Sequence, residues 1–321
     1  MRFGGFVPQG WRMDLEDIET ADQWDTMVDV ALRLEKAGYE SAWVYDHFHT
    51  VPKPTQGPTY ECWTLMAALA PVTETIRLGQ MCTCNSYRPP SYMAKVASSV
   101  DVISGGRLDF AIGAGWYEHE YLAYGYEYPK PSVRIGQLDE AVQIIKKMWT
   151  EDEASFDGKY YSINGAINRP RPLQDPHPPL WIAGGGEQLT LRVVAEHADY
   201  ANFAGTPETF THKSNVLAGH CEKVGRDFGE IGRTIHLVSM VDADDAAIER
   251  AAAQFEAPVD KFLGGPMTVA GSADEVANRL GEYAGAGCDY FIMYFPDAVW
   301  GDSIEAFASD VIPAMGKESA E

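Results

Sequence analysis

The chain has 321 residues, 45% of them hydrophobic and 12% aromatic, which is enough for one large or two ordinary domains with a sizeable core. Acidic side chains outnumber basic ones by 47 to 25, and the net charge of -22 argues against a nucleic-acid or anionic-membrane partner, because both bind through basic patches. The five cysteines are an odd number without a CxxC pair, and we interpret them as reduced thiols, mostly in the core.

The chain opens with a strand over residues 2–7, and no leader-like segment or run of membrane length is found, so we expect a cytoplasmic protein. Residues 22–36 have helical spacing of apolar residues, and Gly38 ends this helix. A second strand over 41–46 runs into the polar cluster Asp46-His47-Phe48-His49. The alternation then continues, with strands predicted over 76–83, 107–114, 179–183, 200–204, 234–241 and 289–295, and helices over 61–70, 91–103, 133–149, 188–197, 207–224, 245–255, 272–286 and 303–315.

About eight apolar strands that alternate with helices predict an α/β fold, and we favour a closed TIM (β/α)8 barrel with insertions at its C-terminal face. An open, doubly wound parallel sheet is the alternative. No change in composition marks a second domain, so residues 1–321 are expected to form a single barrel domain. Residues 153–172 interrupt the pattern with an expected hairpin, and residues 256–270 with an irregular segment.

Side chains beyond the carboxyl ends of parallel strands face the ligand, so Thr83, Asn85, Ala114 and Gly115 are expected at a binding cavity. His47 follows the second strand and should stand at the barrel mouth, where an imidazole can pass protons to a reacting centre. A histidine that merely caps a loop is the alternative interpretation. Asp46, beside it, would orient the ring or hold the loop.

Gly184, Gly185 and Gly186 lie between a strand and a helix, where bare backbone N–H groups suit a phosphate, although a tight turn explains them equally well. Trp116 and Tyr117, together with Trp11, are expected to wall an apolar pocket, with ordinary core packing as the alternative.

Other chemistries find no support in the sequence. His119-Glu120 does not continue into an HExxH zinc motif, because position 123 is alanine, and no other spacing indicates a metal. A dinucleotide fingerprint and a GxSxG nucleophile elbow are also missing.

Five segments in the right order carry a family resemblance that covers nearly the whole chain. They are Gly38-Tyr-Glu-Ser-Ala-Trp-Val-Tyr-Asp-His-Phe48, Leu78-Gly-Gln-Met-Cys-Thr-Cys-Asn-Ser-Tyr-Arg88, Ser104-Gly-Gly-Arg107, Gly113-Ala-Gly-Trp-Tyr-Glu118 and Pro179-Leu-Trp-Ile-Ala-Gly-Gly-Gly186. Together they resemble the luciferase-like monooxygenase superfamily, and within it the oxidoreductases that use the deazaflavin coenzyme F420.

The resemblance implies a barrel, usually a homodimer, that holds a flavin-like ring at its C-terminal mouth. It implies a non-prolyl cis peptide at Met81–Cys82, behind the ring, and it matches His47 to a catalytic proton donor or acceptor. The glycines at 184–186 match a segment near the cofactor phosphate. The full set of expected cofactor contacts is Asp46, Met81, Cys82, Thr83, Asn85, Ala114, Gly115, His119, Gly184, Gly185 and Gly186, with no metal.

One departure bears on the substrate. Trp116 stands where the sugar-phosphate dehydrogenases of this branch carry a glutamate, which disfavours sugar-phosphate oxidation and favours an apolar or aromatic small-molecule substrate. The expected reaction is hydride transfer between coenzyme F420 and that substrate; an FMN-dependent monooxygenase and a non-catalytic binding protein are the alternatives. The acidic tail of the cofactor needs cations at the mouth, and Arg88, Lys95 and Arg192 are candidates by position.

Overall fold

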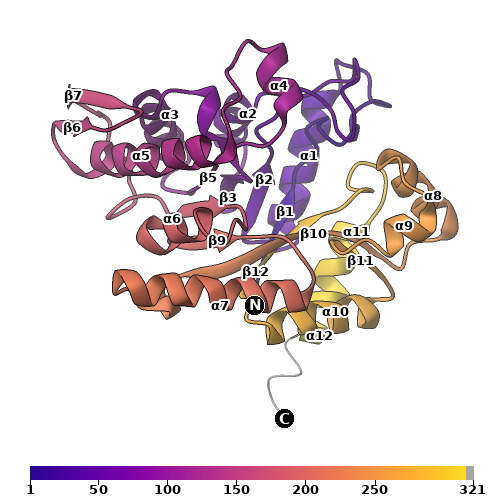
Figure 1. The fold of residues 1–321 in the computed structure, drawn as a ribbon. Helices are drawn as coiled ribbons and strands as arrows, with labels where there is room; N and C mark the ends of the chain where they lie inside the picture. Colours follow the sequence, from indigo (N-terminus) through magenta and orange to yellow (C-terminus); the bar gives the residue numbers. More distant parts are fainter. Residues whose placement is uncertain (316–321) are drawn as a thin grey trace.

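Parallel strands alternate with helices in the computed structural model, which describes residues 1–315 (Figure 1). The eight barrel strands are β1 (Arg2–Phe6), β2 (Ser41–Val44), β3 (Arg77–Gln80), β5 (Leu108–Gly113), β8 (Leu180–Ala183), β9 (Tyr200–Asn202), β10 (Gly232–Val241) and β12 (Tyr290–Tyr294). Each strand pairs in parallel with its neighbours, and β10 pairs with both β9 and β12, so the sheet closes on itself. The predicted TIM barrel is therefore confirmed, and the open sheet is excluded.

The helices surround this barrel. They are α1 (Gln23–Lys36), α2 (Cys62–Leu69), α3 (Pro90–Ile103), α4 (Glu118–Ala123), α5 (Pro131–Thr150), α6 (Thr190–His197), α7 (Pro207–Val224), α8 (Asp245–Gln254), α9 (Val259–Leu263), α10 (Ala273–Gly285), α11 (Ser303–Ala306) and α12 (Ile312–Met315), with short 3-10 turns η1 (Asn85–Tyr87) and η2 (Phe228–Glu230) and a π-helical stretch η3 (Phe307–Val311). Among residues 1–315, every helix is too short or too polar to cross a membrane.

Local sequence signals explain several of these boundaries. The inward face of α1 carries Met27, Val30, Ala31 and Leu34, which are all buried and recur at helical spacing. At the start of α10 the Ser272 hydroxyl accepts a hydrogen bond from the Glu275 N–H, and the Glu275 carboxylate accepts one from the Ser272 N–H. This capping box satisfies two backbone donors that the first helical turn leaves unpaired.

The third strand is shorter than predicted. Residues 76–83 were expected to form one strand, but β3 ends at Gln80 and the chain resumes pairing as β4 (Thr83–Cys84). The peptide between Met81 and Cys82 is cis, at the position that the family resemblance implies.

Three further segments depart from the regular alternation. Residues 256–270 were expected to be irregular, but they contain α9 and most of β11 (Thr268–Gly271), which pairs with the end of β10. This pairing is possible because β10 runs past the barrel and offers a free edge. The short helix α4 after β5 was not predicted. An antiparallel hairpin of β6 (Ala154–Asp157) and β7 (Ser162–Ala166) stands out from the barrel at the left of Figure 1.

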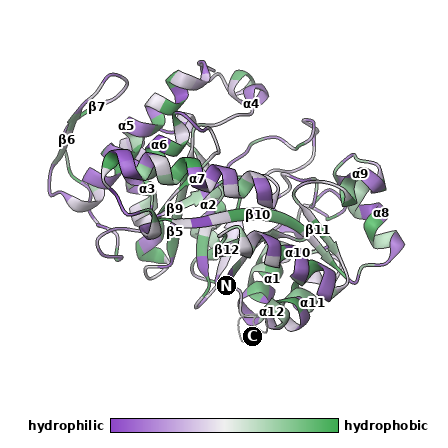
Figure 2. Ribbon diagram, turned by 60° about the horizontal axis from the view of Figure 1, so that its bottom comes forward, coloured by the Kyte–Doolittle hydropathy of each residue, from purple (hydrophilic) through white to green (hydrophobic). Residues whose placement is uncertain are grey.

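Aromatic side chains fill the barrel interior. The ring centroids of Trp43 and Trp181 are 4.9 Å apart, and those of Trp181 and Tyr290 are 5.3 Å apart, with all three side chains buried. A Cβ atom at Gly79 would overlap the Trp43 ring, so only glycine fits this position of β3. Figure 2 shows the hydrophobic stretch of β10 crossing the middle of the molecule, with hydrophilic residues on the outer helices. The packed interior forms the floor of a cavity at the C-terminal ends of the strands.

Candidate active site

A cavity of about 510 Å³ opens at the carboxyl ends of the barrel strands. Its lining residues come from loops and strand ends all around the barrel: Trp11, Arg12, Tyr45, Asp46, His47, Met81, Cys82, Cys84, Tyr87, Gly113, Ala114, Gly115, Trp116, Tyr117, Pro131, Arg134, Ile135, Ala183, Gly184, Gly185, Thr190, Asn202, Phe203, Ala204 and His236. Pockets of this size, largely apolar with a few polar groups, are typical of cofactor and small-ligand sites.

His47 lies in this cavity between aromatic rings. Its imidazole is parallel to the Trp11 indole, with centroids 4.4 Å apart and an interplanar angle of 3°. The rings of Trp116 and Tyr117 approach its edge at 5.7 and 6.0 Å. These neighbours restrict both the orientation of the imidazole and the access of water to it.

Glu120 on α4 determines which nitrogen of His47 is free. Its Oε2 lies 2.8 Å from His47 Nδ1 and accepts a hydrogen bond from the Tyr87 hydroxyl at 2.8 Å, while Oε1 accepts from the N–H groups of Phe48 and His49. Burial by itself raises the pKa of Glu120, but these hydrogen bonds outweigh it and hold the pKa below its ordinary value. The fully buried carboxylate therefore binds Nδ1 of His47 and leaves Nε2 as the atom able to exchange a proton in the cavity.

Asp46 does not orient His47, contrary to one of the two roles expected for it. Its carboxylate accepts two hydrogen bonds from Arg88, at 2.7 and 2.9 Å, and one from the Cys84 N–H at 2.8 Å. Asp46 thus holds the loop, which was its other expected role, because it ties the end of β2 to β4 and η1.

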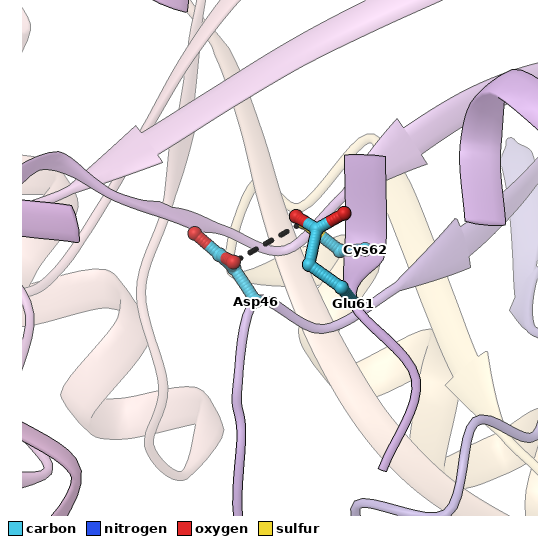
Figure 3. A group of neighbouring side chains, drawn as sticks. All are labelled: Asp46, Glu61 and Cys62. Carbon is cyan, nitrogen blue, oxygen red and sulfur yellow. Dashed lines mark hydrogen bonds between the residues drawn. The ribbon is translucent and has the colours of Figure 1, made fainter. Parts of the chain in front are cut away.

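The group around Asp46 has the composition of a metal site. Asp46, Glu61 and Cys62 offer ligand atoms within 4.8 Å of one another, and the Cys62 thiol donates to Asp46 at 3.3 Å (Figure 3). Arg88 already pairs with both carboxylates, since it also donates to Glu61 at 2.5 Å, and it occupies the place where a cation would bind. Burial and the neighbouring Asp46 charge raise the pKa of the Cys62 thiol well above its ordinary value, so it is a poor metal ligand.

Met81, Cys82 and Gly115 form one side of the cavity. Cys82 and Cys84 both line it, as expected for two residues on the same face of a strand, and Thr83 between them points the other way. A Cβ atom at Gly115, whose φ is +76°, would overlap the Tyr121 hydroxyl and lie 2.7 Å from Cys84 Sγ. Glycine is therefore required here both by conformation and by space.

The glycine segment after β8 is only partly exposed to the cavity. Gly184 and Gly185 line it together with Thr190, the first residue of α6. Lys213 on α7 donates a hydrogen bond to the Gly185 carbonyl at 2.6 Å, which brings a cation to this end of the cavity. Gly186 does not line the cavity, because its carbonyl turns toward α6 and accepts from the Leu191 N–H at 3.0 Å.

Most of the predicted site residues converge on this one cavity, and four do not line it. His47, Asp46, Met81, Cys82, Ala114, Gly115, Gly184, Gly185, Trp11, Trp116 and Tyr117 all line it. The Thr83 hydroxyl instead accepts a hydrogen bond from Trp63 Nε1 at 3.2 Å, and Asn85 donates to the Tyr161 hydroxyl at 3.3 Å. The exposed His119 lies beside His49, with ring centroids 5.0 Å apart and the rings tilted by 50°.

None of the three cations expected at the mouth lines the cavity. Arg88 forms ion pairs with Asp46 and Glu61. Lys95 donates to the Arg169 carbonyl at 2.8 Å, and Arg192 lies 3.7 Å from Asp139. The arginines that do line it are Arg12 and Arg134.

Sequence reasoning missed Arg12, Glu120 and His236. His236 was the most detectable, since it is the one ionisable residue in the predicted strand 234–241, which is mostly apolar. Glu120 gave no signal distinct from its neighbour Glu118, because only the fold shows that one is buried and the other exposed.

Comparisons with known proteins agree with this geometry. The family model described as luciferase-like monooxygenase matches residues 1–263. An F420-dependent glucose-6-phosphate dehydrogenase from Amycolatopsis mediterranei is 26% identical and is aligned over 90% of this chain and 94% of its own. A pyrimidine monooxygenase RutA from Cronobacter turicensis is 29% identical over 77% of this chain and 67% of its own. Among solved structures, an F420-dependent secondary alcohol dehydrogenase in complex with an F420-acetone adduct superposes with a TM-score of 0.82 over 98% of both chains, at 22% identity.

Proposed function

Because the chain belongs to the luciferase-like monooxygenase family, we propose that it is an oxidoreductase that transfers a hydride between coenzyme F420 and a small organic substrate. Relatives named as F420-dependent dehydrogenases, which align with about nine tenths of the chain, support this choice. The observation that carries it is the position of His47, whose free Nε2 faces a cavity large enough for a ring system and a second small molecule.

The residues that line the cavity fit such a cofactor. Met81, Cys82 and Gly115 present a surface without charged groups, where a flat ring can lie. At the other end, Gly184 has a φ of +128°, and a Cβ atom there would crowd Thr190 Cγ2 at 3.2 Å, so glycine is favoured beside the start of α6 and leaves the backbone bare there. Together with Lys213, the amides at this helix start suit the cofactor phosphate.

The bound cofactor supplies two-electron hydride chemistry, and the chain's own residues supply position and a proton. His47 holds or accepts the proton at Nε2, because Glu120 occupies Nδ1. Trp11 on one face, with Trp116 and Tyr117 at the edge, keeps the imidazole oriented and limits water. Trp116 cannot donate or accept a catalytic proton, which leaves His47 as the acid–base group on this side of the cavity.

An FMN-dependent monooxygenase is the second candidate, and the similarity to a pyrimidine monooxygenase favours it. The same cavity surface suits either tricyclic ring. The two candidates differ in their chemistry with oxygen, since the deazaflavin has a carbon atom in place of the N5 nitrogen of flavin and reacts poorly with O2.

Titration of the purified protein with oxidised F420 and, separately, with FMN tests the proposal. We expect stoichiometric quenching and a spectral shift with F420, and a much weaker response to FMN. A stoichiometric response to FMN alone would overturn the proposal in favour of the monooxygenase. Binding of F420 without reduction or oxidation of any organic partner would indicate a non-catalytic binding protein.

A further inference from the structure

Arg12 is a cation without a counter-ion in the described part of the chain. Its guanidinium carbon lies 4.4 Å from the Trp11 ring centroid and 5.0 Å from that of Phe255, so it is held between two aromatic side chains. Its Nε is buried and makes no hydrogen bond with residues 1–315, and its guanidinium forms no ion pair there. A partly desolvated cation in this state is unfavourable unless a ligand pairs with it.

The acidic residue on the same loop does not serve as this partner. Asp14 accepts hydrogen bonds from the Gly10 N–H at 2.6 Å and from the Tyr294 hydroxyl at 2.9 Å. Burial raises the pKa of Asp14, and burial also raises the pKa of Tyr45, where it outweighs the opposing effect of the nearby Arg12 charge. No ion pair joins Asp14 to Arg12 among residues 1–315. The chain has 47 acidic side chains and a net charge of -22, yet this cavity arginine has no acidic partner among residues 1–315.

His236 lies in the same cavity, and its tautomer can be read from a chain of hydrogen bonds. The Thr234 hydroxyl donates to the Ala201 carbonyl, so its oxygen accepts from the Asn202 amide N–H at 3.0 Å. The amide oxygen of Asn202 must then face His236 Nδ1, 3.3 Å away, which makes Nδ1 the donor. The neutral ring therefore presents Nε2 as an acceptor, and this atom makes no hydrogen bond with the described residues.

From these two groups we infer that the substrate half of the cavity binds an aromatic or unsaturated carboxylate that carries a neighbouring O–H or N–H group. Arg12 pairs with the carboxylate, and His236 Nε2 accepts the hydrogen bond from the neighbouring donor. Trp11 and Tyr45 provide the apolar wall for the rest of the molecule. A single guanidinium matches one negative charge, which favours a carboxylate over a phosphate dianion. The binding of such a carboxylate does not depend on the proposed function. Only the description of the bound molecule as a substrate rests on that function.

Calorimetric titration of the full chain, with and without F420, tests the inference with salicylate, benzoate and benzamide as probes. Salicylate has a carboxylate and an adjacent hydroxyl, benzoate lacks the hydroxyl, and benzamide lacks the charge. We expect affinity to fall in that order, and R12L to weaken salicylate binding about 10- to 100-fold. The variant H236F should remove most of the preference for salicylate over benzoate.

Arg250 offers a matched control. It also stacks on an indole, at 4.6 Å from the Trp300 centroid, but it is exposed, pairs with Asp17 and lies outside this cavity. R250L should leave salicylate binding unchanged, and thermal unfolding of each variant checks that it is folded.

Two outcomes would overturn the inference. In one, R12L binds salicylate as tightly as the parent protein does. In the other, R12L loses affinity for F420 itself, which would assign Arg12 to the cofactor. Failure of the parent protein to bind F420 would instead count against the proposed function, while the titrations without cofactor would still test the carboxylate site.

Discussion

His47 is the residue on which the proposed chemistry most directly depends. Replacing it with asparagine keeps a polar group near Glu120 but removes the exchangeable proton at Nε2. We expect H47N to bind F420 within about two-fold of the parent protein and to lose roughly 100- to 10 000-fold in the rate of hydride transfer, the range typical of a missing general acid or base. Single-turnover absorbance of the cofactor measures the rate, and fluorescence titration measures the binding.

His49, two residues further on, provides the control for this variant. Its ring lies beside that of His119 and does not line the cavity. H49N should therefore retain most of the rate. A full rate in H47N would show that another group moves the proton.

The second cavity histidine, His236, predicts a specific dependence of stability on pH. Burial, followed by the positive charge of Arg12, lowers the pKa of His236 from 6.5 to about 4. Between these values the unfolded chain binds a proton that the folded chain does not, so this contribution to stability is lost as the pH falls from about 6.5 to 4.

The variant H236Q isolates that contribution, because glutamine does not titrate. Relative to H236Q, the parent protein should lose up to about 3 kcal/mol of unfolding free energy between pH 7 and pH 4. Urea denaturation at each pH measures the difference. Parallel curves for the two proteins would mean that His236 ionises normally in the folded state.

At the scale of secondary-structure elements, the packing of β3 against β2 depends on the missing side chain of Gly79. A Cβ atom there would overlap the ring of Trp43, which is fully buried and held by Trp181. We expect G79A to destabilise the protein by about 1 to 3 kcal/mol, as overpacked cores do. Chemical denaturation measures this change.

Gly219 in α7 is the matched control for the same substitution. A Cβ atom there would meet no other atom within 4 Å, and the residue lies in the interior of a helix. G219A should stabilise the protein by about 0.4 to 1 kcal/mol, because alanine loses less backbone entropy on folding. A similar loss of stability in both variants would contradict the packing argument.

At the scale of the whole molecule, the net charge of -22 repels a cofactor that carries a phosphate and an acidic tail. Long-range repulsion slows the encounter, and salt screens it, since the Debye length is about 10 Å at 0.1 M ionic strength. We therefore expect the association rate constant for F420 to rise about two- to ten-fold between 10 and 200 mM salt. Stopped-flow fluorescence measures it.

The opposite trend would identify a dominant local attraction. Arg12 and Arg134 line the cavity and Lys213 contacts Gly185 at its edge, and if their field outweighed the net charge, association would slow as salt is added. Substrates without charge should show no dependence in either case.

The order of strands and helices, the barrel and the place of the cavity at its C-terminal mouth could be predicted from the sequence by itself, and most of the predicted site residues do line that cavity. Apolar runs of strand length that alternate with amphipathic helices require a parallel sheet covered on both faces, and such strands place their carboxyl ends at one common rim. This is why Ala114 and Gly115 could be placed near His47 although they are far apart in the chain, whereas Met81 was placed there by the family resemblance.

Only the tertiary structure decided the partners of the charged groups. Whether Asp46 or Glu120 holds His47, and whether Arg88 or Arg12 is free in the cavity, depends on which side chains meet across different elements. Asp46 is next to His47 in the sequence, and Glu118 and Glu120 lie two residues apart, but of these three carboxylates only Glu120 contacts the imidazole. Hydrophobic periodicity can be read from residues that are close in the sequence. An ion pair or a desolvated cation depends on residues that are far apart in the sequence and meet only in the folded chain.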